Sequence, residues 1–117
     1  MTITVHNARK PIPKGCTPVY VGRKTTYRPE FGADFSILGN PYTLRKHGTR
    51  AEAIALYRQW LPLRLNADTP QTRALEALAN RIRAGESLLL ICWCAPLACH
   101  ADVITEELER LTQETSV

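Results

Sequence analysis

Three cysteines and a histidine lie within one short segment, Cys92-Trp93-Cys94-Ala95-Pro96-Leu97-Ala98-Cys99-His100. A cysteine beside a histidine, at the amino end of a helix, has a lowered pKa and becomes a nucleophilic thiolate near neutral pH. Cys99 is therefore the candidate nucleophile and His100 the candidate acid or base, with Cys94 as a second thiol. The alternative is that the cysteines are small apolar core residues, which applies above all to Cys92.

The same four side chains, Cys92, Cys94, Cys99 and His100, are also the ligand types of a zinc site. A tetrahedral site with three cysteines and one histidine is a known arrangement. The spacing is unusual, because the adjacent Cys99 and His100 would both have to reach an ion that the other two cysteines also contact. Zinc is therefore an alternative to a metal-free thiol site.

A second polar cluster lies in the segment Gly39-Asn40-Pro41-Tyr42. A residue before proline is held extended, and a glycine lets the backbone turn or approach a ligand closely, so Asn40 can present its amide in a fixed pose. Ordinary turn chemistry explains the same residues equally well. We include Gly39, Asn40 and Pro41 among the candidate ligand-binding residues.

Gly22 and Arg23 follow an expected strand, and Asp102 lies near the start of the expected last helix. Arg23 is the preferred anion-binding residue, because a guanidinium group binds phosphate and carboxylate through two parallel hydrogen bonds. A surface role for Arg23 is the alternative. Asp102 favours the positive end of the helix dipole, and it could also orient His100.

The elements around the cysteines would place them at the edge of a sheet. The apolar run of residues 87–94 predicts a central strand covered on both faces, with Cys92 and Cys94 on one face and Trp93 in the core on the other. Pro96 stops this strand, and a helix begins at His100 or Ala101. The carboxyl end of the strand and the amino end of the helix then meet where open α/β sheets bind ligands, and the helix dipole favours an anion there.

The rest of the chain predicts two further helices, two further strands and the segments that connect them. Thr49 with Glu52 forms a capping box that starts a helix, which Pro62 ends or kinks. A second helix begins near Thr69 and stops before Gly85. The other expected segments are strands at 3–6 and 18–22, a connector at 9–15 and a long loop at 23–44. The order predicts one α/β domain over residues 1–117, with a short, mostly parallel, Rossmann-like sheet and helices packed on it.

The composition fits a single domain without disulfides. The chain has 117 residues, of which 44% are hydrophobic, and a chain of this length can bury a sufficient core. No apolar run is long enough to span a membrane, and the first residues lack the pattern of a signal peptide, so we expect a cytoplasmic protein with free thiols. His6 and His47 have no evident partner in the sequence, and we expect solvated or simply hydrogen-bonded rings.

The charge is unevenly distributed. Fifteen Lys and Arg residues stand against eleven Asp and Glu residues, a net charge of +4, and most residues in the first 50 that carry charge are basic. A basic amino-terminal half is a weak indication of a polyanionic partner, such as a nucleic acid. A solvated basic face without a partner explains it equally well.

The chain resembles a bacterial and phage family known as Domain of Unknown Function 4326. The residues that carry the resemblance are Val19-Tyr20-Val21-Gly22-Arg23, Gly39-Asn40-Pro41-Tyr42, Gly48-Thr49-Arg50 with the helix that follows, and the segment from Cys92 to Val103. The resemblance implies a bacterial or phage origin and no particular activity. It also marks residues 24–38 as an insertion, which would alter ligand choice if it covered the cleft.

Two functions follow as hypotheses. In the first, the cleft between the cysteine segment and the Gly39-Asn40-Pro41 turn binds or processes a nucleotide or another phosphate-bearing small molecule. In the second, the chain is a zinc-stabilised module that contacts nucleic acid or a host protein, for example as a phage-encoded inhibitor. The sequence leaves open whether the protein is an enzyme.

Overall fold

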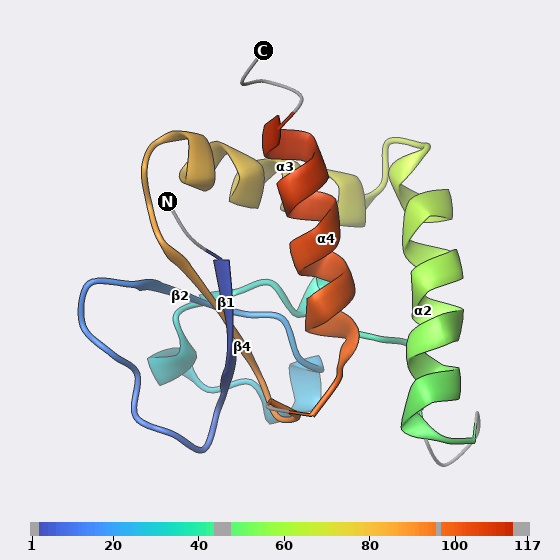
Figure 1. Cartoon of the computed structure of the whole chain (residues 1–117), viewed down its shortest axis with the longest axis horizontal. Coiled ribbons are helices and arrows are strands. Elements are labelled where there is room, and N and C mark those ends of the chain that lie inside the picture. The colour runs from blue at the N-terminus through green and yellow to red at the C-terminus, as the bar shows by residue number, and fades with distance from the viewer. Residues whose placement is uncertain (1–2, 44–47, 96, 114–117) are drawn as a thin grey trace.

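A parallel sheet of four strands forms the centre of the fold (Figure 1). The computed structural model describes residues 3–43, 48–95 and 97–113, so the predictions for Pro96 and His47 lie outside the described residues. The strand order is β1-β4-β2-β3, and every paired neighbour runs parallel. The strands are β1 (Ile3–Asn7), β2 (Thr17–Tyr20), β3 (Ala33–Asp34) and β4 (Leu88–Cys92).

The central strand β4 is buried along its whole length, as predicted. Its register places Ile3 of β1 and Thr17 of β2 on either side of Leu88. Because side chains alternate along a strand, its residues contribute to a core on each face of the sheet. The strand ends at Cys92, yet the alternation continues: Cys94 packs with one core and Trp93 with the other.

Three helices, α2 (Arg50–Leu65), α3 (Pro70–Arg83) and α4 (His100–Gln113), cover one face of the sheet. Thr49 and Glu52 form the predicted capping box of α2. Of the two alternatives predicted for Pro62, an end of the helix or a kink, the first is wrong, because α2 continues through it to Leu65. A proline inside a helix removes one backbone hydrogen bond. Here Leu61 is fully buried and Leu65 also packs against the core, which holds the last turn in place.

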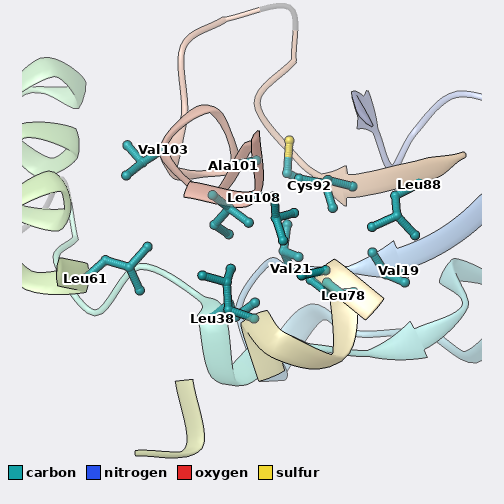
Figure 2. Close-up of a cluster of buried hydrophobic side chains, with 14 of the residues drawn as sticks. Val19, Val21, Leu38, Leu61, Leu78, Leu88, Cys92, Ala101, Val103 and Leu108 are labelled. Atoms are coloured by element: carbon teal, nitrogen blue, oxygen red, sulfur yellow. The ribbon is translucent and has the colours of Figure 1, made fainter. Parts of the chain in front are cut away.

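The larger core lies between the sheet and the helices, and Figure 2 shows side chains from strands and helices meeting there, Cys92 among them. A smaller core covers the opposite face of the sheet. It is built from Tyr20, Phe31, Leu89 and Ile91, with Trp93 partly buried against it. The ring of Phe31 meets Trp93 edge-on, with 5.7 Å between the ring centroids. The predicted burial of β4 on both faces is therefore confirmed, but segments without α-helix cover the second face.

Residues 24–38, expected as a loop, cover much of the sheet face that lies opposite the three helices. They contain β3 and three short 3-10 helices, at Lys24–Thr26, Pro29–Phe31 and Ser36–Leu38. Gly32 makes this path possible: its φ is +89°, and a Cβ atom there would overlap the carbonyl oxygen of Pro18. The chain can therefore turn sharply after Phe31 and pair with β2, which no hydrophobic period in the sequence indicates.

The prediction of an α/β domain with a parallel sheet and helices packed on it is confirmed. None of the helices formed by the described residues is long and apolar enough to cross a membrane.

Candidate functional site

A cavity of about 170 Å³ lies beyond the carboxyl ends of β2 and β4. Four segments contribute to it: the end of β2, the Gly39-Asn40-Pro41 turn, the first turns of α2 and the connection from β4 to α4. The lining residues are Arg23, Asn40, Tyr42, Arg50, Ala53, Ile54, Trp93, Cys94, Cys99 and His100. Five of the residues singled out in the sequence therefore come together at one place: Arg23, Asn40, Cys94, Cys99 and His100.

Three cysteines are gathered around Cys99, and two of them, Cys94 and Cys99, line the cavity. Cys99 lies just before α4, where its Sγ accepts a hydrogen bond from the Ala101 N–H at 3.3 Å. The thiol of Cys99 is also 3.4 Å from Cys92 Sγ, and it lies next to Cys94. Cys92 and Cys99 are buried, whereas Cys94 is half-buried and lines the cavity. Cys94 is therefore the sulfur of the three that combines a neighbouring thiol with access to solvent.

The three cysteines differ in their acidity. The hydrogen bond from Cys99, together with the Arg50 guanidinium that hydrogen-bonds the sulfur and the charge of Arg23, lowers the pKa of Cys94 to about 6. The bond from Cys99 and the backbone N–H groups of residues 94 and 95 lower the pKa of Cys92 to about 7. Cys99 has one proton to share, and among the described residues Arg50 and Arg23 act on Cys94 whereas no cation acts on Cys92, so we place the thiolate at Cys94.

The pKa of Cys99 itself is raised, because its thiol donates to two other sulfurs and is buried. The expectation that the helix end lowers the pKa of Cys99 is therefore wrong. A thiol that donates its proton to a neighbouring sulfur is stabilised in its protonated form. From the sequence we considered the effect of the helix dipole and of His100 on this pKa, but not the two sulfur atoms that accept hydrogen bonds from Cys99.

His100 connects the start of α4 to the end of β2. The residue is 9% exposed, and Nε2 of its ring donates a hydrogen bond of 2.6 Å to the carbonyl oxygen of Val21. The ring of Tyr57 packs edge-on against it at 5.3 Å. Burial lowers the pKa of His100, and the charge of Arg23 lowers it further. The ring is therefore neutral at pH 7, and Nδ1 is the nitrogen that can accept a proton.

Asn40 uses its side chain to fasten the turn to α2. Its Nδ2 donates to the carbonyl oxygen of Ala53 at 3.3 Å, and its Oδ1 accepts from the N–H of Tyr42 at 2.9 Å. Arg23 reaches the same turn, because its Nη2 donates to the Tyr42 carbonyl oxygen at 3.1 Å. Asn40 thus positions Tyr42 and the start of α2, and through Tyr42 it also positions Arg23.

The other predicted ligand-binding residues do not line the cavity. A Cβ atom on Gly39 would lie 3.0 Å from the carbonyl oxygen of Gly22, so the absence of a side chain on Gly39 allows the turn to pack closely against the segment after β2; a Cβ atom on Gly22 would instead overlap the side chain of Tyr20. Pro41 follows Asn40 in the turn without lining the cavity. The Oδ2 atom of Asp102 accepts the Cys99 N–H at 3.0 Å and thereby caps α4.

No group of three or more His, Cys, Asp or Glu residues is arranged to hold a metal ion within the described ranges. Among the four predicted zinc ligands, His100 already donates Nε2 to Val21. The described residues therefore give no support for a zinc site. Cys16 packs against the smaller core on the opposite face of the sheet.

Sequence reasoning missed Arg50, Ala53 and Ile54 as lining residues, and it placed Tyr42 in the polar cluster without choosing it as a ligand-binding residue. Arg50 is the first residue of α2, directly after the capping box, so the well-marked start of that helix was the available signal. The topology that brings this helix start to the edge of the sheet has no local signature.

Trp93 was expected in the core, and it both packs there and lines the cavity. Its Nε1–H donates to the Tyr20 hydroxyl at 3.2 Å, and that hydroxyl donates to the Arg23 carbonyl oxygen at 2.6 Å. The guanidinium of Arg9 lies 5.3 Å from the centroid of the Trp93 ring. Arg9 is therefore a third cation, beside a residue that lines the cavity.

The insertion at residues 24–38 was expected to alter ligand choice if it covered the cleft. The structure describes all of these residues, and they pack on the sheet without lining the cavity.

Comparison with known proteins adds one match. No curated protein and no solved structure matches the chain. The family described as Domain of unknown function (DUF4326) matches residues 5–110, which is most of the sequence. The chain therefore belongs to the DUF4326 family.

Proposed function

We propose that the cavity binds a phosphate-bearing small molecule, with Arg23 and Arg50 as the groups that contact the phosphate. The observation that carries this proposal is that both guanidinium groups line one cavity in which no lining residue, among those described, is Asp or Glu. Arginine suits this role because its planar group donates parallel hydrogen bonds to two phosphate oxygens.

The surrounding backbone favours the same ligand. Arg50, Ala53 and Ile54 belong to the first turns of α2, and His100 is the first residue of α4, so the amino ends of two helices border the cavity. The positive end of a helix dipole attracts an anion. The carboxyl edge of a parallel sheet is also where α/β proteins commonly bind phosphate-bearing ligands.

The size of the cavity restricts the ligand. A volume of about 170 Å³ is below the range of roughly 300–1,000 Å³ that is usual for drug-sized ligands. A phosphate with a sugar-sized group fits this space, and the base of a nucleotide would have to lie partly outside it. We therefore expect a sugar phosphate or a mononucleotide rather than a dinucleotide.

A thermal-unfolding screen tests the proposal. The probes are inorganic phosphate, ribose 5-phosphate and nucleoside monophosphates, each paired with its uncharged counterpart, ribose or the nucleoside. A ligand at a hundredfold excess over its Kd stabilises the native state by about 2.7 kcal/mol. We expect stabilisation by phosphorylated probes alone, and its loss in Arg23→Gln and Arg50→Gln.

Arg58→Gln is the matched control, because Arg58 is an exposed arginine on the same helix that pairs with Glu106. Equal stabilisation by phosphorylated and uncharged probes would contradict the proposal. So would binding that survives in both cavity variants. A single-stranded oligonucleotide belongs in the same screen: stabilisation by it alone would assign the site to nucleic acid instead.

A further inference from the structure

We propose that Cys94 and Cys99 form a peroxide-reactive thiol pair, in which Cys94 is oxidised first and Cys99 then closes a disulfide with it. This inference concerns the sulfur atoms alone and does not depend on which ligand the cavity binds.

Access to solvent distinguishes the thiol that reacts first. Cys94 is half-buried and lines the cavity, whereas Cys92 is 1% exposed and Cys99 is 3% exposed. Cys99 does contribute to the cavity wall, but its thiol donates to other sulfurs and is held in the protonated form. A small oxidant that enters the cavity therefore meets Cys94 as the exposed and reactive sulfur.

Arg50 prepares Cys94 for this reaction. Its guanidinium hydrogen-bonds the Cys94 sulfur, which favours the thiolate. The thiolate is the form that reacts with peroxides, and accessible thiolates beside a second thiol are typical of redox-sensitive cysteines. The same cation also stabilises the hydroxide ion that leaves when the peroxide bond breaks.

Cys99 is placed to complete the reaction, because Cys94 and Cys99 line the same cavity and the Cys99 thiol lies next to the Cys94 sulfur. In the first step the Cys94 thiolate attacks hydrogen peroxide: an S–O bond forms, the O–O bond breaks, and hydroxide leaves. In the second step the Cys99 sulfur attacks the Cys94 sulfenic acid: an S–S bond forms, the S–O bond breaks, and the Cys99 proton leaves with the oxygen as water. Two electrons pass from the sulfur atoms to the peroxide.

Cys92 provides an internal comparison. Its sulfur lies 3.4 Å from that of Cys99, so it is also close enough to form a disulfide after a small movement. It does not line the cavity, however, and no Lys or Arg of the described part of the chain is among the groups that lower its pKa. If accessibility and the contact with Arg50 decide which sulfur reacts, Cys94 and not Cys92 is the first to be oxidised.

The test is to treat the reduced protein with a small excess of hydrogen peroxide, block the remaining thiols and map the disulfide by mass spectrometry. Chymotrypsin cuts after Trp93 and Leu97, which separates Cys92, Cys94 and Cys99 into different peptides. We expect a linkage between Cys94 and Cys99 in the unmodified protein, in Cys92→Ala and in Cys16→Ser.

Two further variants separate the steps. Cys99→Ser should accumulate a sulfenic acid at Cys94 that dimedone traps, and Cys94→Ser should lose at least tenfold in the rate of disulfide formation. Circular dichroism of each reduced variant verifies the fold. A disulfide between Cys92 and Cys99 that forms at the original rate in Cys94→Ser would overturn the proposal. Preferential dimedone labelling of Cys16, or no disulfide in the unmodified protein, would overturn it as well.

Discussion

Replacement of Arg50 by glutamine should make Cys94 a much weaker acid. In the native structure the pKa of Cys94 is lowered from 9.0 to about 6, and Arg50 contributes to this through a hydrogen bond and through its charge. A hydrogen-bonded opposite charge shifts a pKa by about one to three units, and partial exposure of Cys94 places the effect at the low end. We therefore expect the pKa to rise by about one unit in Arg50→Gln.

The consequence for reactivity near neutral pH is a loss of somewhat less than half of the thiolate. With a pKa of about 6, roughly nine-tenths of Cys94 is thiolate at pH 7, and a rise of about one unit reduces this fraction to about one half. Cys99 remains in place to donate its hydrogen bond, and Arg23 keeps its charge. The variant should therefore retain a pKa below the ordinary thiol value.

The assay is the rate of alkylation of Cys94 by iodoacetamide between pH 5 and pH 9, followed on the chymotryptic peptide that begins at Cys94. Arg58→Gln removes a positive charge from the same helix without touching the cavity and should leave the midpoint unchanged. A midpoint near 8.5 in the unmodified protein, or the same midpoint with and without Arg50, would refute the assignment of the thiolate.

Three further predictions concern how the site is held. Asn40→Ala should lower the free energy of unfolding by about 1–3 kcal/mol, because the Ala53 carbonyl and the Tyr42 N–H lose the hydrogen bonds that Asn40 makes with them. Urea unfolding measures this loss. In the control variant Asn80→Ala, which changes an exposed residue, stability should change by less than about 0.5 kcal/mol. Gly32→Ala should destabilise more than Gly15→Ala in the same assay, since both glycines have positive φ but only Gly32 lacks space for a Cβ atom; equal losses would contradict the packing argument. The pKa of His100 is lowered in the folded state, so the unfolded state binds the proton first and the free energy of unfolding should fall as the pH drops below 6.5. Urea unfolding measured from pH 8 to pH 5 should show a smaller loss of stability in His100→Gln than in the unmodified protein. Identical pH profiles would mean that the fold does not hold the ring neutral.

The sequence predicted those parts of the fold that depend on local signals. Thr49 with Glu52 started α2 where expected, and an unbroken apolar run placed the central strand. The prediction that Pro62 could end α2 was wrong. A proline removes one hydrogen bond from a helix, but the burial of the neighbouring Leu61, which depends on tertiary packing, holds the helix together. The pairing of β3 with β2 was also missed, since it depends on one glycine rather than on a periodic pattern.

The sequence predicted the residues of the site that lie at the ends of strands and at the starts of helices. Arg23, Asn40 and the cysteines of the β4–α4 connection lie at one cavity because their elements converge at the same edge of the sheet. Arg50 was not identified, because its approach to Cys94 depends on how α2 packs against the other helices. The distribution of protons among the sulfurs also required the structure, since the contacts of Cys99 decide it.

The most direct test of a phosphate site at this cavity is a two-dimensional NMR titration of the ¹⁵N-labelled protein with ribose 5-phosphate. The account predicts saturable shift changes for the backbone amides of Arg23, Arg50, Cys94 and His100, with little change along the exposed face of α2 around Arg58. It also predicts that Arg50→Gln weakens the response and that ribose produces none. Shift changes centred elsewhere, or equal changes with ribose, would contradict it.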